Sequence, residues 1–419
     1  MNESYEKRVL PNGVRILYEH VPTVRSVSAG IWVGTGSRFE KAGESGIAHF
    51  IEHMLFKGTE TRTASELAML MDGAGGQTDA FTSKDSTCFY GRVLDTNLDL
   101  LLDVLCDMFF HSTFRPEDVE AERGVILEEI GMYEDSPEDR CVERLFGAVW
   151  KGHPLAKPIL GSPRSLRGID GERMRRFMAE HYRGGSIVVA LSGSFEQRHI
   201  DYLGERFAAA PAGSEREPKA PVYQPGVTVK RKRTEQNQLC VAFPSCVMAA
   251  PERFATQLLS NILGGSMSSR LFQTLREQMG LCYSVSSFTT AHSDAGLFAV
   301  GTALSQETEE AALRAIVGEI QKLLDGGVTE DELARSREQV KSGVLMGLES
   351  TMTRMNRLAR GELFLGEITP AEELIERYNA VTAADVLAVA REIFRPELCS
   401  LSAVGRVRTP EEYAELLRF

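Results

Sequence analysis

Hydrophobic and polar residues follow two kinds of pattern along the chain, one typical of β-strands and one typical of α-helices. Each half of the chain contains both patterns. In the first half, β-rich runs at 14–18 and 27–33 are followed by segments whose apolar residues recur every three or four positions. The second half has the same order, with β-rich runs at 227–230 and 239–243 ahead of helical segments. The pattern predicts an α+β protein made of two α/β domains, each a mainly antiparallel sheet packed with helices.

A segment rich in proline, glycine and charge separates the halves. Residues 211–226, PAGSEREPKAPVYQPG, have the composition of a linker. They predict a first domain over 1–210 and a second over 227–419.

The two halves also align with each other. A shift of 207 places Gly58 on Gly265, and after an apparent seven-residue insertion a shift of 214 places 116–119 on 330–333. The order of the matches holds over about a hundred residues, which is the signature of an internal repeat. We therefore expect two domains of one topology.

Composition and charge narrow the classes of function. The 419 residues are 43% hydrophobic, and 59 acids against 47 lysines and arginines give a net charge of −12. A field of that sign repels phosphate backbones and attracts basic peptides, so we expect no nucleic-acid partner. The chain shows no signal peptide and no apolar run of about 18 residues, and its seven cysteines are never spaced as CxxC. These features predict a cytoplasmic protein with free thiols and no membrane contact.

One segment with a helical pattern carries two histidines and a glutamate, His49, Glu52 and His53. Ser45 is placed to cap its start and Gly58 to end it. Positions four apart share one face of a helix, so both imidazoles can bind one cation. Glu52 can reach a metal-bound water without being a ligand. Zn²⁺ suits two imidazoles and a carboxylate, with a fourth position open for that water.

A second helical segment offers the carboxylate. It starts at Pro116 beside two acids, and its Glu122 and Glu129 are seven residues apart and share a face, while Glu128 points elsewhere.

A solvated surface helix is the simpler explanation of the two histidines taken alone. The repeat favours a site, because the aligned positions of the second half lack every one of these polar groups. The replacing residues are Thr256, Leu259, Ser260 and Gly343.

The order HxxEH is the inverted zinc-peptidase motif. Together with the residues that follow it, over 49–59, it resembles the pitrilysin/insulinase family of zinc peptidases in its processing-peptidase branch, which includes the mitochondrial processing peptidase β subunit. The resemblance covers essentially the whole chain and implies the pitrilysin-like metallohydrolase fold. It implies that His49, His53 and Glu129 are the Zn²⁺ ligands. It also implies that Glu52 is the general base and that Glu122 is an acid that supports the site.

The resemblance also implies substrate-binding residues. In the segment 276–283, REQMGLCY, it assigns Arg276 and Tyr283 to contacts with the substrate and the developing oxyanion. Without the resemblance, the sequence alone would indicate a solvated helix residue at Arg276 and a core or sheet aromatic at Tyr283. Relatives have Asn-Ala where this chain has Asp79 and Ala80, on a strand edge that pairs with extended substrate. The added carboxylate is expected to favour basic residues or to shift the pH profile.

The resemblance predicts a zinc endopeptidase that hydrolyses peptides or unfolded segments in an enclosed chamber. The acidic charge of the chain adds an expected preference for basic residues. It also implies a homodimer whose two sites are each completed in trans by Arg276 and Tyr283 of the partner. Two alternatives stay open: a noncatalytic core or assembly subunit of the same fold, and a peptide-binding protein that uses the strand edge without hydrolysis.

Overall fold

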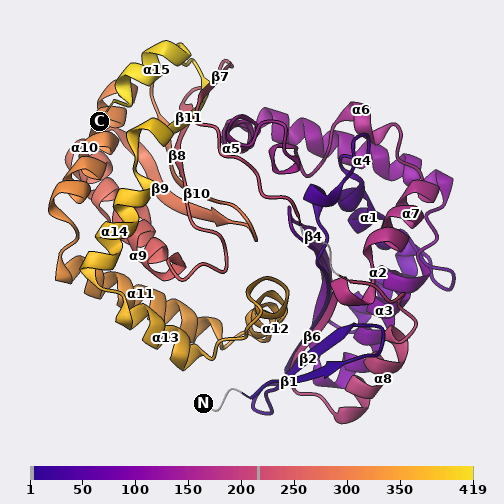
Figure 1. Cartoon of the computed structure of the whole chain (residues 1–419). Helices are drawn as coiled ribbons and strands as arrows, with labels where there is room; N and C mark the ends of the chain where they lie inside the picture. Colours follow the sequence, from indigo (N-terminus) through magenta and orange to yellow (C-terminus); the bar gives the residue numbers. More distant parts are fainter. Residues whose placement is uncertain (1–3, 215–217, 419) are drawn as a thin grey trace. The chain divides into compact units, whose positions relative to one another are not determined.

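A computed structural model describes residues 4–214 and 218–418 (Figure 1). The chain forms two compact units, each with its own sheet and core. The first consists of Met1–Ile130, Lys157–Pro218 and Leu345–Ala371, and the second of Gly131–Ala156, Lys219–Val344 and Glu372–Phe419. The predicted α+β class is confirmed, with mixed but mainly antiparallel sheets.

The sheet of the first unit has six strands in the order β1-β2-β6-β3-β5-β4. Only β2 and β6 run parallel to each other, and the other neighbours are antiparallel. The strands are β1 (Glu6–Val9), β2 (Arg15–His20), β3 (Ser26–Val33), β4 (Gln77–Thr82), β5 (Thr87–Leu94) and β6 (Ile187–Gly193).

Helices share an apolar core with one face of this sheet. They are α1 (Ile47–Leu55), α2 (Ala64–Gly73), α3 (Leu98–His111), α4 (Pro116–Asp135), α6 (Pro163–Leu166), α7 (Gly171–His181) and α8 (Gln197–Phe207). Because successive strand residues point to opposite faces, Ile16 and Ile31 enter this core whereas Leu17 and Trp32 point to the other face.

The second unit repeats the design with five strands in the order β7-β11-β8-β10-β9. This is the order of β2-β6-β3-β5-β4, again with one parallel pair, β7 and β11. The predicted repeat is therefore confirmed at the level of topology. The strands are β7 (Val227–Arg231), β8 (Asn237–Pro244), β9 (Cys282–Ala291), β10 (Gly296–Leu304) and β11 (Ser400–Gly405).

The helices of the second unit likewise bury one face of its sheet. They are α9 (Arg253–Gly264), α10 (Glu309–Gly326), α11 (Glu330–Gly347), α13 (Ala371–Ala380), α14 (Ala383–Ile393) and α15 (Pro410–Leu416). All seven cysteines of the chain are free thiols. Over 4–214 and 218–418, none of the helices is both long and apolar enough to cross a bilayer.

Each unit covers the second face of its sheet with a helix from the other half of the sequence. Helix α12 (Thr351–Arg360) packs on β2, β3 and β6 of the first unit, and α5 (Pro137–Val149) packs on β8 and β11 of the second. The compact units therefore differ from the linear segments 1–210 and 227–419. Amphipathic spacing predicts that such a helix buries one face, but it does not say against which sheet. Three residues of the expected linker 211–226, at 215–217, lie outside the described residues.

Candidate metal centre

Helix α1 carries the two histidines and is anchored by its apolar residues. Its buried Phe50 and Ile51 lie in the core of the first unit, and the helix packs against β4 and β5. The helix begins at Ile47 rather than at a cap on Ser45, so that prediction is wrong. The carboxylate of Glu40 instead accepts hydrogen bonds from the N–H groups of Gly46 and Ala48, at 2.9 and 3.1 Å. Burial raises the pKa of Glu40 to about 8, and these two hydrogen bonds only partly offset that rise.

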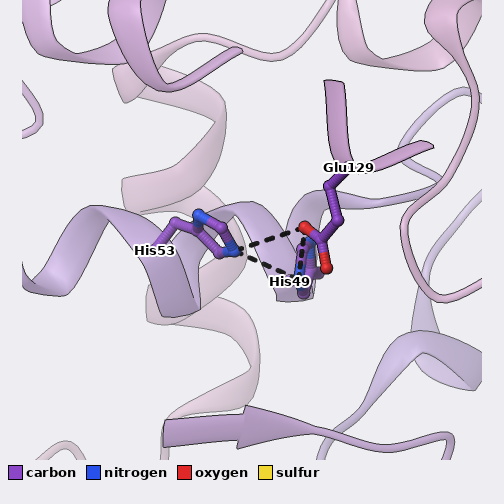
Figure 2. Close-up of side chains that lie close together, drawn as sticks. All are labelled: His49, His53 and Glu129. Carbon is purple, nitrogen blue, oxygen red and sulfur yellow. Dashed lines mark hydrogen bonds and ion pairs between the residues drawn. The ribbon is translucent and has the colours of Figure 1, made fainter. Parts of the chain in front are cut away.

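Three ligand atoms converge between α1 and α4 (Figure 2). The Nε2 atoms of His49 and His53 are 3.2 Å apart, and Oε2 of Glu129 lies 3.6 and 3.7 Å from them. Two ligands bonded to a tetrahedral zinc are separated by about 3.3 Å, given bond lengths near 2.0–2.1 Å. Within residues 4–214 and 218–418, Oε2 of Glu129 is also buried without a hydrogen-bond partner. The donor set therefore fits a zinc ion and leaves one coordination position open.

A chain of two side chains holds His53 from behind. Oε1 of Glu122 lies 2.8 Å from Nδ1 of His53, and Oε2 of Glu122 lies 2.5 Å from Nζ of Lys57. The Glu122 side chain is only 6% exposed. A carboxylate at Nδ1 directs the ring so that Nε2 faces the proposed metal. Lys57 was not among the predicted residues, although it stands four positions after His53, where a helix-based search could have found it.

Burial controls the protonation of the centre. Desolvation, followed by the nearby charge of His53, lowers the pKa of His49 to about 3, so this ring is neutral at pH 7 and can act as a ligand. Burial raises the pKa of Glu129 and also that of Glu52. Oε2 of Glu52 is buried and has no hydrogen-bond partner among the described residues. Its carboxylate is thus placed beside the cluster without being one of the three converging ligands.

The predicted substrate strand is β4, which is the last strand of its sheet. Asp79 lies opposite Tyr90 of β5, and its Oδ2 accepts a hydrogen bond from the Tyr90 hydroxyl at 3.2 Å. Oδ1 of Asp79 accepts from the N–H of Ala80 at 2.8 Å. An incoming peptide that pairs with this N–H has to displace the Asp79 carboxylate.

The second unit contains the predicted Arg276 and Tyr283. Arg276 lies in a π-helical segment, η5 (Phe272–Gln278), and Tyr283 lies in the edge strand β9. The guanidinium carbon is 5.0 Å from the centre of the Tyr283 ring and 4.7 Å from that of Phe272. The structure therefore brings the two residues together and adds Phe272, which sequence reasoning had not singled out. Tyr283 is 76% exposed.

Two family descriptions match the chain. "Insulinase (Peptidase family M16)" matches residues 15–163, and "Peptidase M16 inactive domain" matches residues 168–340. The first match contains the three converging ligands, and the second contains Arg276 and Tyr283.

Known proteins resemble the chain over nearly its full length. It is 40% identical to the uncharacterized zinc protease YmxG of Bacillus subtilis, over 91% of this chain and 94% of that protein. An uncharacterized zinc protease of Streptomyces coelicolor is 38% identical, over 96% and 90%.

Solved structures show the same fold. A peptidase M16 inactive domain from Pseudomonas fluorescens superposes with a TM-score of 0.91 at 19% identity, covering 98% of this chain and 99% of that one. A protease from Helicobacter pylori gives 0.89 at 21% identity, covering 96% and 99%. On the family matches and the extent of these identities, the chain belongs to the insulinase family, peptidase family M16.

Proposed function

We propose that the chain is a zinc-dependent endopeptidase that hydrolyses peptides or unfolded segments. The observation that carries the proposal is the cluster of His49, His53 and Glu129 beside a half-buried Glu52, whose buried Oε2 has no hydrogen-bond partner among the described residues. The names of the bacterial relatives, which are zinc proteases, support zinc as the cofactor. The family resemblance further supports cleavage inside an enclosed chamber, where folded proteins should resist attack.

In this mechanism His49, His53 and Glu129 hold the zinc ion. When bound, zinc supplies a Lewis acid for the scissile carbonyl and lowers the pKa of a water toward 7. Oε2 of the Glu52 carboxylate accepts a proton from the attacking water, and Glu52 then returns this proton to the leaving amine. Glu122 keeps the His53 ring oriented. The edge of β4 orients the peptide by main-chain hydrogen bonds once Ala80 N–H is released from Asp79.

The Glu52→Gln variant tests the assigned base. We expect it to bind zinc at the wild-type stoichiometry and to lose at least about a hundredfold in kcat on a quenched peptide, because a single positioned base contributes about 10²–10⁴-fold. The matched control is Glu128→Gln, which removes an exposed carboxylate of α4. Wild-type turnover by Glu52→Gln would remove Glu52 from the mechanism.

The same measurements separate the two alternatives. A noncatalytic assembly subunit should contain no stoichiometric zinc. A peptide-binding protein should bind the labelled peptide but give no turnover that a chelator abolishes.

A preference for basic substrates follows from charge. The net charge of −12 and the exposed Asp79 on β4 both favour cationic peptides. Two quenched peptides that differ only in lysine or glutamate next to the cleaved bond should differ in kcat/KM, with the lysine peptide faster at low salt. Equal values would remove the charge argument.

A homodimer with sites completed in trans is the proposed assembly. The exposed Tyr283 ring, held under Arg276, has the character of a surface that receives a ligand. Mixing a Glu52→Gln subunit with an Arg276→Ala/Tyr283→Ala subunit should restore activity, because one site in each mixed dimer is intact. Mixed dimers that stay inactive would contradict sharing. The seven free cysteines support a cytoplasmic location, which cell fractionation can test.

A further inference from the structure

The carboxyl ends of the two parallel strands of the second unit form a basic pocket. Strands β7 and β11 lie side by side (Figure 1). Their register pairs Arg231 with Gly405. The residues that follow leave the sheet together, which brings Lys232 and Arg233 next to Arg406. These four cationic side chains line an open pocket of about 470 Å³. Ligands of α/β sheets commonly bind outside the carboxyl ends of parallel strands.

Three of the four cations have no side-chain partner in the part of the chain that the structure describes. Lys232 is ion-paired with Asp135 at 3.1 Å. Within residues 4–214 and 218–418, the side chains of Arg231, Arg233 and Arg406 form no ion pair and no hydrogen bond. Two acids interact with these arginines electrostatically, Glu307 with Arg406 and Glu412 with Arg231. Neither acid lies within ion-pair distance, so the arginines can still bind an anion.

The neighbouring Arg408 shows the contrast. Its Nε lies 3.1 Å from Oε1 of the buried Glu309, so this arginine is already neutralised inside the protein. Unpaired guanidinium groups around one pocket repel one another, and a multivalent anion relieves that repulsion.

The backbone beneath the pocket is fixed before any ligand arrives. Oδ1 of Asn237 accepts from the N–H of Arg406 at 2.7 Å, and its Nδ2 donates to Glu309 at 2.6 Å. Gly405 has φ +140°, and a Cβ there would lie 2.3 Å from Oδ1 of Asn237. These contacts therefore fix the main chain that carries Arg406 at the wall of the pocket, which lowers the entropic cost of ordering that segment on binding.

We propose that this pocket binds a small molecule that carries two or more phosphate groups. The planar fork of a guanidinium matches two phosphate oxygens, and arginine is preferred over lysine at such sites. Gln306, whose side chain carries an amide donor, also lines the pocket. The volume lies within the range of about 300–1,000 Å³ that is typical of small-molecule sites. This site is independent of the proposed peptidase centre and uses none of its residues.

Titration calorimetry on the full zinc-loaded chain tests the proposal. The probes are fructose 1,6-bisphosphate and inorganic tripolyphosphate at low salt. The variant is Arg231→Gln/Arg233→Gln/Arg406→Gln. We expect it to bind both probes at least about tenfold more weakly than wild type, since three charge-assisted contacts are lost. The matched control, Arg164→Gln/Arg167→Gln/Arg335→Gln, removes three exposed arginines elsewhere and should keep wild-type affinity.

Three results would overturn the proposal. One is equal affinity in wild type and variant, which is also the result expected if the heat came from zinc extraction by the probe. Another is an equal loss in the control, which would reduce the effect to net charge. The last is tighter binding of hexaglutamate than of either phosphate compound, which would assign the pocket to an acidic peptide.

Discussion

At the scale of single residues, the position of His53 depends on Lys57 as well as on Glu122. Lys57 lies 2.5 Å from the carboxylate that contacts Nδ1 of His53. We predict that Lys57→Met weakens zinc binding several-fold, because Glu122 loses the cation that holds its second oxygen. Glu122→Gln should cost more, about 10–100-fold, as expected for a direct partner of a metal ligand. Competition with a chromophoric chelator measures both.

The double variant distinguishes positioning from a general loss of stability. In the Glu122→Gln background, Lys57→Met should have little further effect on zinc affinity, since the contact is already lost. Lys41→Met is the matched control. Lys41 is an exposed lysine that precedes α1 in the sequence, and its ion pair is with Glu180 rather than with Glu122. An undiminished effect of Lys57→Met in the Glu122→Gln background would show that Lys57 acts by another route.

At the scale of elements, α11 is the counterpart of α4 and has a reinforced start. Glu332 caps it through Thr329 N–H at 2.8 Å and also forms a two-pronged ion pair with Arg270 at 2.7 and 2.8 Å. Burial by itself would raise the pKa of Glu332, but the hydrogen bonds from Arg270 and Thr329 outweigh it and lower the pKa to about 2.

This lowered pKa predicts the pH dependence of a variant. The folded state holds the ionised form more tightly than the unfolded chain does, so the contribution of Glu332 is present above pH 4.5, the ordinary value, and is lost as the pH falls toward 2. Glu332→Gln should cost about 1–2 kcal/mol of unfolding free energy near pH 7. The difference from wild type should narrow by about pH 3 in urea titrations. Glu330→Gln, in the same first turn, is the control; a gap that does not depend on pH would contradict the assignment.

Local patterns predicted these helices but not what holds their ends. The four-residue spacing of His49 and His53 places α1 correctly, and Pro116 marks the start of α4. The cap of α1 was missed because Glu40 reaches it from a separate turn, and no short-range signal records that contact. The spacing of Glu122 and Glu129 puts them on one face, whereas the crossing of α4 over α1, which brings Glu129 to the histidines, is tertiary and came only from the family resemblance.

At the scale of the whole molecule, each half of the sequence supplies a helix to the compact unit formed mainly by the other half. Met355 of α12 is buried with Leu17 and Trp32 of the first unit, and Leu145 of α5 is buried with Cys240 and Leu297 of the second. In the first unit, a buried ion pair of 2.5 Å between Arg354 and Glu19 also joins α12 to β2. Neither 1–210 nor 227–419 therefore contains a complete unit.

Two core substitutions in the full chain should reveal the swapped helices by amide hydrogen exchange. Each substitution should speed hydrogen exchange in strands of the other half of the sequence. Met355→Ala, in the second half of the sequence, should speed exchange in β2, β3 and β6, all in the first half. Leu145→Ala should do the reverse and speed exchange in β8 and β11. Each removes a fully buried side chain and should cost about 2–5 kcal/mol locally. If each variant instead loosened the strands of its own half of the sequence, the domains would follow the linear boundaries, and the exchanged helices would contribute little to the stability of the sheets they cover.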